Sequence, residues 1–166
     1  MTQILDRPTY PVGYDFIDDD CKNLGEYLAN EVNETFAVAL DGNAIKTFKP
    51  FNDIFIPITD FPVLKVYKSN ETSLDFLSNI ADTEFTISYS LAYTQASKTA
   101  DVSVIVAKEL VRLLKVYSFR NGMQLQHDVP ITVQYDELID TENTVYTYAT
   151  IKCNFLTIAS DAYPCT

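Results

Sequence analysis

The chain has 166 residues, a length that favours one domain with a core of its own. Hydrophobic residues make up 47% of it and charged residues 21%, which excludes a disordered or low-complexity protein. The 23 acidic residues outnumber the 12 basic ones and leave a net charge of −11. This balance argues against proteins that grip nucleic acid through its phosphates and against proteins that dock on anionic membranes.

The cysteines indicate a reducing compartment. Cys21, Cys153 and Cys165 form no CxxC pair, and an odd, widely spaced set does not make a disulfide framework. Residues 1–12 lack the apolar run of a signal peptide, and no apolar stretch is long enough for a transmembrane helix. We therefore expect a soluble, cytosolic protein.

The chain is predicted to open with an extended arm over residues 1–14, followed by a helix that starts near Asp18. One stripe of apolar residues at helical spacing predicts this helix: Ile17, Cys21, Leu24, Leu28 and Val32. The aspartates at positions 18–20 suit an N-cap and first turn, because they accept hydrogen bonds from free N–H groups. They lack the spaced ligands and the glycine of a calcium loop, so capping is favoured over a cation site.

A strand is predicted over Thr35–Leu40, ahead of a turn at 41–43. Residues 44–60 are expected to form an irregular loop or edge segment with a short β piece near 54–58, because Pro50 and Pro57 do not suit a central strand. Three phenylalanines make this loop unusually apolar: Phe48, Phe51 and Phe55. Such a loop either belongs to an interface or packs against the core, and both readings stay open.

Two further strands and a second helix are predicted next. Val63–Lys68 alternates as a strand with one solvated face, and Ser69–Asp82 suggests at most a short helical turn. Glu84–Thr94 alternates throughout, with Phe85, Ile87, Tyr89, Leu91 and Tyr93 on one face. An apolar stripe from Val102 to Tyr117 then predicts a helix, capped by Ser97 or Thr99 and stopped by Asn121-Gly122.

The remaining chain is predicted to be a β-hairpin. Its strands are Ile131–Leu138 and Thr144–Ala159, and residues 140–143 form the turn. The second strand would span roughly 50 Å at 3.3 Å per residue, so we expect it to project beyond its own core or to bend at a bulge. Tyr146 and Tyr148 share one of its faces. The fold class that follows is α+β: a mainly antiparallel β-sheet packed against two α-helices, with a long C-terminal β-hairpin.

Candidate catalytic residues are few. The chain has no nucleophile elbow, phosphate-binding glycine loop or zinc-protease motif, and its four glycines are isolated. His127, the single histidine, is predicted to be a solvated loop residue, and Cys153 is predicted to be a buried, inert thiol. We therefore expect no enzyme, no cofactor and no metal site.

Across residues 15–159 the arrangement resembles that of phage tail terminator proteins, also called tail completion or minor tail proteins. Four features carry the resemblance: the helix from Asp18, the strand after the Phe-Pro step in Phe61–Tyr67, the strand Thr86–Tyr93 that leads into the helix Val102–Tyr117, and a hairpin ending in Thr150–Phe155. Architecture rather than invariant residues unites this family, so no single motif is diagnostic and no catalytic residue carries over.

The resemblance implies one α+β domain over residues 15–159 with a C-terminal tail at 160–166. It also implies a hexameric ring that caps the tail tube and joins the tail to the head, as part of a virion assembled in the host cytoplasm. The implied partners are the tail tube protein, a head-completion or connector protein of the neck and, as a further candidate, the tail sheath. DNA would pass through the ring without specific binding. The candidate subunit-interface residues are Phe48, Phe51, Phe55, Tyr146 and Tyr148.

Three other functions remain open. A head-completion (stopper) protein of the same neck is the nearest, and it differs in the ring that it contacts. A small-ligand-binding regulatory domain, with residues 48–58 as a lid, and a hydrolase with scattered carboxylates belong to other classes. Rings in solution would favour the structural functions, and monomers would favour the other two.

Overall fold

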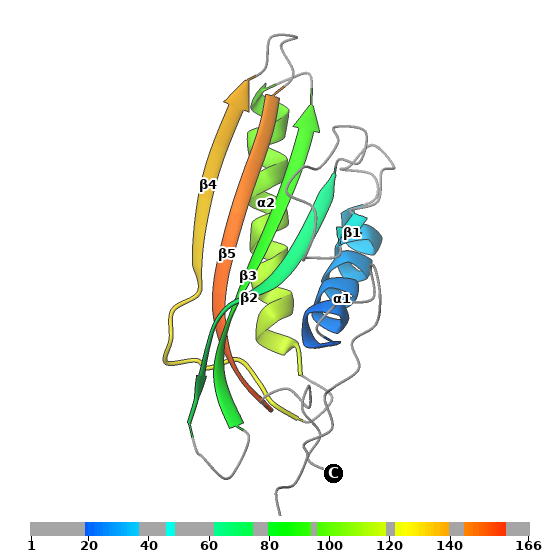
Figure 1. The fold of residues 1–166 in the computed structure, drawn as a ribbon. Helices are drawn as coiled ribbons and strands as arrows, with labels where there is room; N and C mark the ends of the chain where they lie inside the picture. The colour runs from blue at the N-terminus through cyan, green and yellow to red at the C-terminus, as the bar shows by residue number, and fades with distance from the viewer. Residues whose placement is uncertain are drawn as a thin grey trace, which may run out of the picture.

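Two helices pack on one face of a five-stranded sheet in the computed structural model (Figure 1). The structure describes residues 19–36, 46–48, 62–74, 80–93, 96–118, 122–139 and 145–158. Its elements in chain order are α1 (Asp19–Phe36), β1 (Lys46–Phe48), β2 (Val63–Ser73), β3 (Ile80–Tyr93), α2 (Ala96–Val116), β4 (Thr132–Ile139) and β5 (Val145–Ile158).

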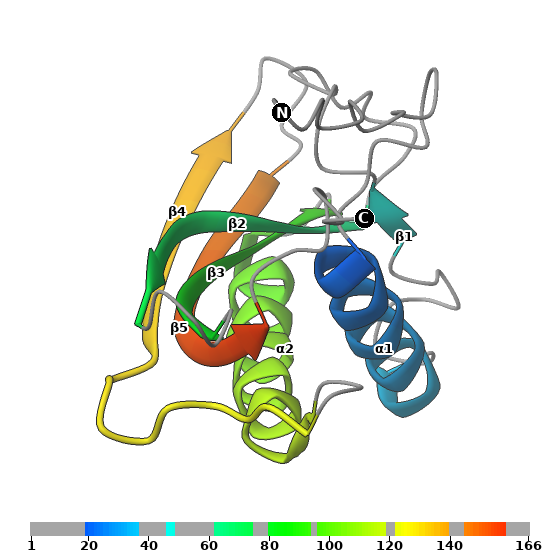
Figure 2. The same cartoon turned by 60° about the horizontal axis from the view of Figure 1, so that its bottom comes forward.

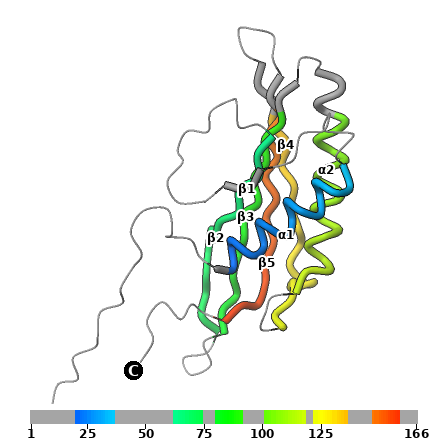
Figure 3. The backbone as a smooth tube through the Cα atoms, turned by 90° about the vertical axis from the view of Figure 1, so that its right-hand side faces the viewer, coloured from blue at the N-terminus to red at the C-terminus, as the bar shows by residue number. Residues whose placement is uncertain are grey.

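The strands lie in the order β1-β2-β3-β5-β4, so β1 and β4 form the two edges of the described sheet. The β1–β2 pair is parallel, whereas β2–β3, β3–β5 and β5–β4 are antiparallel. The two helices lie side by side beneath this sheet in Figure 2, and Figure 3 shows both on the same side of it. The predicted α+β class, with a mainly antiparallel sheet and two helices, is confirmed.

The strand predicted over Thr144–Ala159 is confirmed as β5, and an equally long partner accommodates its length. β3 and β5 each contain 14 residues and pair without a register shift from Ile80↔Ile158 to Tyr93↔Val145. The last part of β5 extends beyond β4 and instead meets residues 124–126, where the Gln126 N–H donates to the Asn154 carbonyl at 2.8 Å. No bulge interrupts β5, and the twist of the sheet curves it around α2 (Figure 2).

The core lies between the sheet and the helices. The predicted inward face of β3 is confirmed, since Phe85, Ile87, Tyr89 and Leu91 are all buried. The Phe85 ring meets the Phe155 ring of β5 edge to face, with 5.8 Å between the ring centres. The helices complete this core with leucines that lie at helical spacing: Leu24, Leu28, Leu110, Leu113 and Leu114.

Both helices are longer than predicted. α1 continues to Phe36, so Thr35 and Phe36 are helical and not the start of a strand, and the Thr35 hydroxyl donates to the Glu31 carbonyl at 2.9 Å. α2 begins at Ala96, which places Ser97 and Thr99 inside the helix and not at its cap. An apolar stripe marks only the part of a helix that packs on the core, so ends inferred from it fall short.

The segment Ser69–Asp82 is β structure at both of its described ends, and residues 75–79, where the predicted short helical turn would lie, are outside the described residues. β2 continues to Ser73 and β3 begins at Ile80, with a register shift between Lys68 and Asn70. The sequence pattern does not indicate that β2 extends to Ser73, because residues 69–73 are exposed on both faces of the strand and are polar throughout.

Within the predicted loop 44–60 the structure describes a short strand, β1, and nothing further. The rest of that loop, the remainder of the predicted strand 35–40, the arm 1–14, the hairpin turn 140–143 and the tail 160–166 lie outside the described residues. The domain boundaries therefore stay a prediction.

Candidate assembly interface

The five candidate interface residues do not form one described patch. Phe51 and Phe55 lie outside the described residues, and Phe48 is the last residue of β1. Tyr146 and Tyr148 lie in β5, where Tyr148 is half-buried and pairs with Ser90 on one side and Asp136 on the other. Because β2 and β3 separate β1 from β5, Phe48 and the two tyrosines lie three strand spacings apart, about 14 Å.

The outer edge of β4 is a surface that the sequence prediction missed. β4 has eight residues and pairs with β5 from Thr132↔Lys152 to Ile139↔Val145 without a register shift. β4 is the last strand in the order, so no other described strand pairs with its outer edge. Every second residue of such an edge directs its N–H and C=O groups away from the sheet. The sequence carries no local signal for this edge, because strand order depends on contacts between residues far apart in the chain.

The side chains along this edge are exposed. Tyr135 exposes 47% of its surface, and Thr132, Gln134 and Asp136 are exposed as well. The strand contains no proline, lysine or arginine, which are the residues that commonly keep an edge from pairing with another chain. The β4 edge is therefore open to an additional strand.

The outer face of α2 is a second exposed surface, with apolar and basic residues together. Val104, Ile105 and Val116 are exposed apolar side chains of this helix. Its exposed basic residues are Lys108, Arg112 and Lys115. Arg112 is paired within the helix, since its Nε donates to Glu109 Oε2 at 2.9 Å, and this hydrogen bond lowers the pKa of Glu109.

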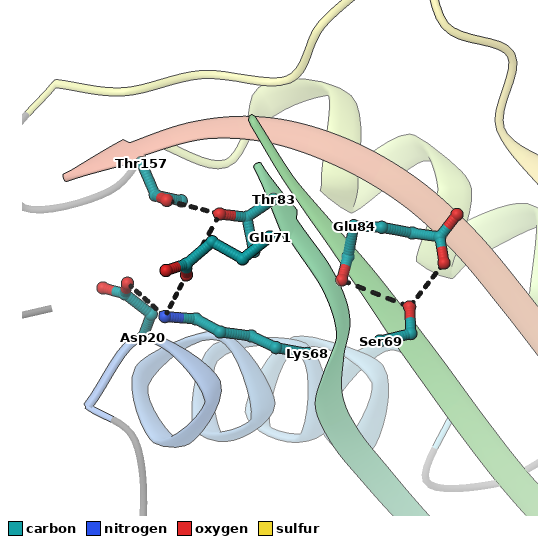
Figure 4. A network of polar contacts seen from close by, with 7 residues as sticks. All are labelled: Asp20, Lys68, Ser69, Glu71, Thr83, Glu84 and Thr157. Carbon is teal, nitrogen blue, oxygen red and sulfur yellow. Dashed lines mark hydrogen bonds and ion pairs between the residues drawn. The ribbon is translucent and has the colours of Figure 1, made fainter. Parts of the chain in front are cut away.

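A polar network fastens the start of α1 to the sheet (Figure 4). The Lys68 ammonium lies 3.4 Å from Asp20 Oδ2 of α1 and 3.4 Å from Glu71 Oε2 of β2. Thr83 continues the network, with its hydroxyl 3.5 Å from the Glu71 carboxylate and 2.6 Å from the hydroxyl of Thr157. An ammonium group occupies the space between the two carboxylates, so the cluster serves as a structural tie.

Hydroxyl groups hold the irregular part of β2 against β3. The Ser69 hydroxyl donates to the Glu84 carboxylate at 2.6 Å, as Figure 4 shows, and accepts a hydrogen bond from Thr86 at 2.8 Å. Ser69 lies at the register shift, where one residue of β2 has no Cα partner in β3. These side-chain bonds thus support the ladder at the position where it is interrupted.

The two residues weighed for catalysis lie where the sequence predicts. Cys153 is fully buried in β5, and burial raises the pKa of its thiol to about 12, so the thiol stays protonated at neutral pH. His127 is exposed in a turn beside Asp128. Among the described residues no three histidine, cysteine or acidic side chains lie close enough together to hold a metal ion. Neither α1 nor α2 is long and apolar enough to span a membrane.

Comparison with known proteins finds a likeness in structure but none in sequence. The sequence matches no protein-family description and no curated protein. A chain in the virion of a native gene transfer agent particle is similar in structure, with a TM-score of 0.42 and 11% sequence identity. The match covers 84% of the present chain and 100% of that chain.

Proposed function

We propose that this chain is a structural virion protein of a tailed bacteriophage: a tail terminator that forms a hexameric ring, caps the tail tube and joins the tail to the neck. The observation that carries the proposal is the open sheet, with an exposed, regular edge at β4 and a different strand, β1, at the opposite edge. A ring made of identical subunits needs two unlike surfaces on different sides of one subunit. The two edges of this sheet meet that requirement.

Charge supports the same proposal. A net charge of −11 gives a ring that repels phosphates, so DNA can move through its opening without being held. The outer face of α2 provides exposed valine and isoleucine side chains beside lysines, a mixture suited to contact with another protein. The partners included in the proposal are the tail tube protein, a neck protein on the head side and the tail sheath.

The proposal assigns no catalytic activity, cofactor or membrane contact to the chain. The buried, protonated thiol of Cys153 is a poor nucleophile. In the Asp20–Lys68–Glu71 cluster one ammonium group contacts both carboxylates, which suits a structural role.

The test is to measure the mass of the purified protein by sedimentation and then to add purified tail tubes and, separately, DNA-filled heads. We expect rings, in solution or on the tubes, and binding at one end of each tube in negative-stain images. Binding to heads but not to tubes would favour the head-completion function instead. A protein that stays monomeric and binds neither particle would overturn the proposal.

A further inference from the structure

We propose that the joint between neighbouring copies is a continuation of the sheet, in which β4 of one copy pairs antiparallel with β1 of the next. The inference rests on the proposed ring, because it names the contact that closes it. Its basis is the composition and direction of the two edge strands, together with the exposure of β4.

β4 has the geometry to accept an added strand. Its pairing with β5 is regular over all eight residues, and its side chains from Thr132 to Asp136 are exposed or half-exposed. A regular edge of this length offers a complete row of hydrogen-bonding groups to an added strand. A strand of three residues, such as β1, could therefore pair along part of β4.

The charges of the two strands favour β1 over a second β4 as the partner of β4. β4 contains Asp136 and Glu137 and no basic residue, so pairing two β4 strands would bring like charges together. β1 begins with Lys46, and Lys49 follows it in the sequence. By sequence β1 carries a lysine whereas β4 carries an aspartate and a glutamate, so charge favours pairing of unlike strands over a two-fold pairing of β4 with itself.

The directions of β1 and β4 suit an antiparallel pair between neighbouring copies. β1 runs parallel to β2, and three successive antiparallel pairings lead from β2 through β3 and β5 to β4. β4 therefore runs opposite to β1 within one subunit. A neighbour turned about an axis along the strands presents β1 antiparallel to β4, which is the more stable kind of ladder. Repeating this operation around a closed ring pairs part of each β4 edge with the β1 strand of the next copy.

The test reverses the charge at each edge. We expect Lys46→Glu and Asp136→Lys each to weaken every joint about fivefold or more, because an attractive cross-strand pair becomes a repulsive one. Mixing the two variants should restore rings, because the β1 edge made acidic in one variant then meets the β4 edge made basic in the other. The double variant K46E/D136K should also assemble alone, and ring yield is read by sedimentation and, with tail tubes, by end binding.

Matched controls separate edge pairing from net charge. Lys22→Glu and Glu26→Lys make the same changes in charge at exposed positions of α1, and both should assemble as the wild type does. The variants Lys46→Gln and Asp136→Asn each remove one charge without introducing the opposite one. We expect each to weaken assembly less than the corresponding charge reversal.

The outcomes distinguish the inference from the proposed function. Assembly that is unchanged by both edge reversals, or that the α1 controls disrupt equally, would overturn the edge joint and leave the terminator function standing. Failure of the mixed reversals to assemble, with each variant folded by circular dichroism, would also overturn the edge joint. A wild type without rings and without tube binding would overturn both.

Discussion

At the scale of single residues, Cys153 shows how neighbours control reactivity. Its side chain lies within the sheet–helix core, and its sulfur is 3.9 Å from the Phe85 carbonyl. Burial in these apolar surroundings disfavours the thiolate and raises the pKa to about 12, with a smaller contribution from the charge of Glu84. The same cysteine in an exposed loop would titrate at about 8.5.

This pKa makes stability depend on alkaline pH. The unfolded thiol loses its proton near pH 9 while the folded one keeps it, so the free energy of unfolding falls as pH rises from about 9 towards 12. We expect the wild type to lose stability more steeply than Cys153→Ala over this range, by about 1.4 kcal/mol per pH unit. Urea denaturation at several pH values measures the two slopes, and equal slopes would contradict the pKa shift.

At the scale of elements, Tyr89 connects a strand to a helix. It projects from β3 to α2, where its hydroxyl donates to the Ser103 carbonyl and lies 3.1 Å from the Ser103 hydroxyl. Burial raises the pKa of Tyr89 well above its ordinary value, so the group remains a donor. This hydrogen bond helps to set the position of α2 along the sheet.

Removing that hydroxyl is expected to destabilise the docking of α2. Tyr89→Phe should lower the free energy of unfolding by about 1 kcal/mol, because one buried hydrogen bond is lost and the ring remains. Tyr135→Phe is the matched control: its ring lies on the exposed edge of β4, and we expect a change below about 0.5 kcal/mol. Chemical denaturation of both variants at a concentration that keeps the protein monomeric makes the comparison.

If the two tyrosines gave equal losses, the hydroxyl of Tyr89 would not contribute to helix docking. A larger loss at Tyr89 with a changed m-value would indicate a rearranged core instead, since m reports the surface exposed on unfolding.

At the scale of the whole molecule, the proposed ring also involves the apolar loop that the sequence places between β1 and β2. Phe51 lies in this loop, outside the described residues. We expect Phe51→Asp to leave the subunit folded by circular dichroism but monomeric by sedimentation, because a charge would enter a desolvated contact repeated at every joint. Tails assembled with the variant should lack a proper end.

An oligomer unchanged by Phe51→Asp would show that the loop lies outside the joint. The edge variants at Lys46 and Asp136 test a different part of the same contact, so the two sets of results are independent. Loss of assembly in both sets would place the loop and the sheet edge together in one interface.

The sequence by itself determined the class of the fold, because the alternation of apolar and polar residues can be read without knowing which elements pack together. The alternation in Phe85–Leu91 and the helical stripe that includes Leu113 and Leu114 specify which faces are buried. Burial of Cys153 follows in the same way from Ile151 and Phe155, which share its face of the strand. The ends of the elements could not be predicted from the sequence in this way. Helices and strands continue through solvated residues beyond their apolar stripes, as α1 and β2 do.

The tertiary structure alone decided which strands lie at the edges. Strand order depends on contacts between residues far apart in the chain, and the insertion of β5 between β3 and β4 leaves no local signal. That order places Phe48 and Tyr148 on strands that β2 and β3 separate, and it leaves Tyr135 and Asp136 exposed. Local periodicity reports which face of a strand is buried, whereas the free edge is a property of the assembled sheet.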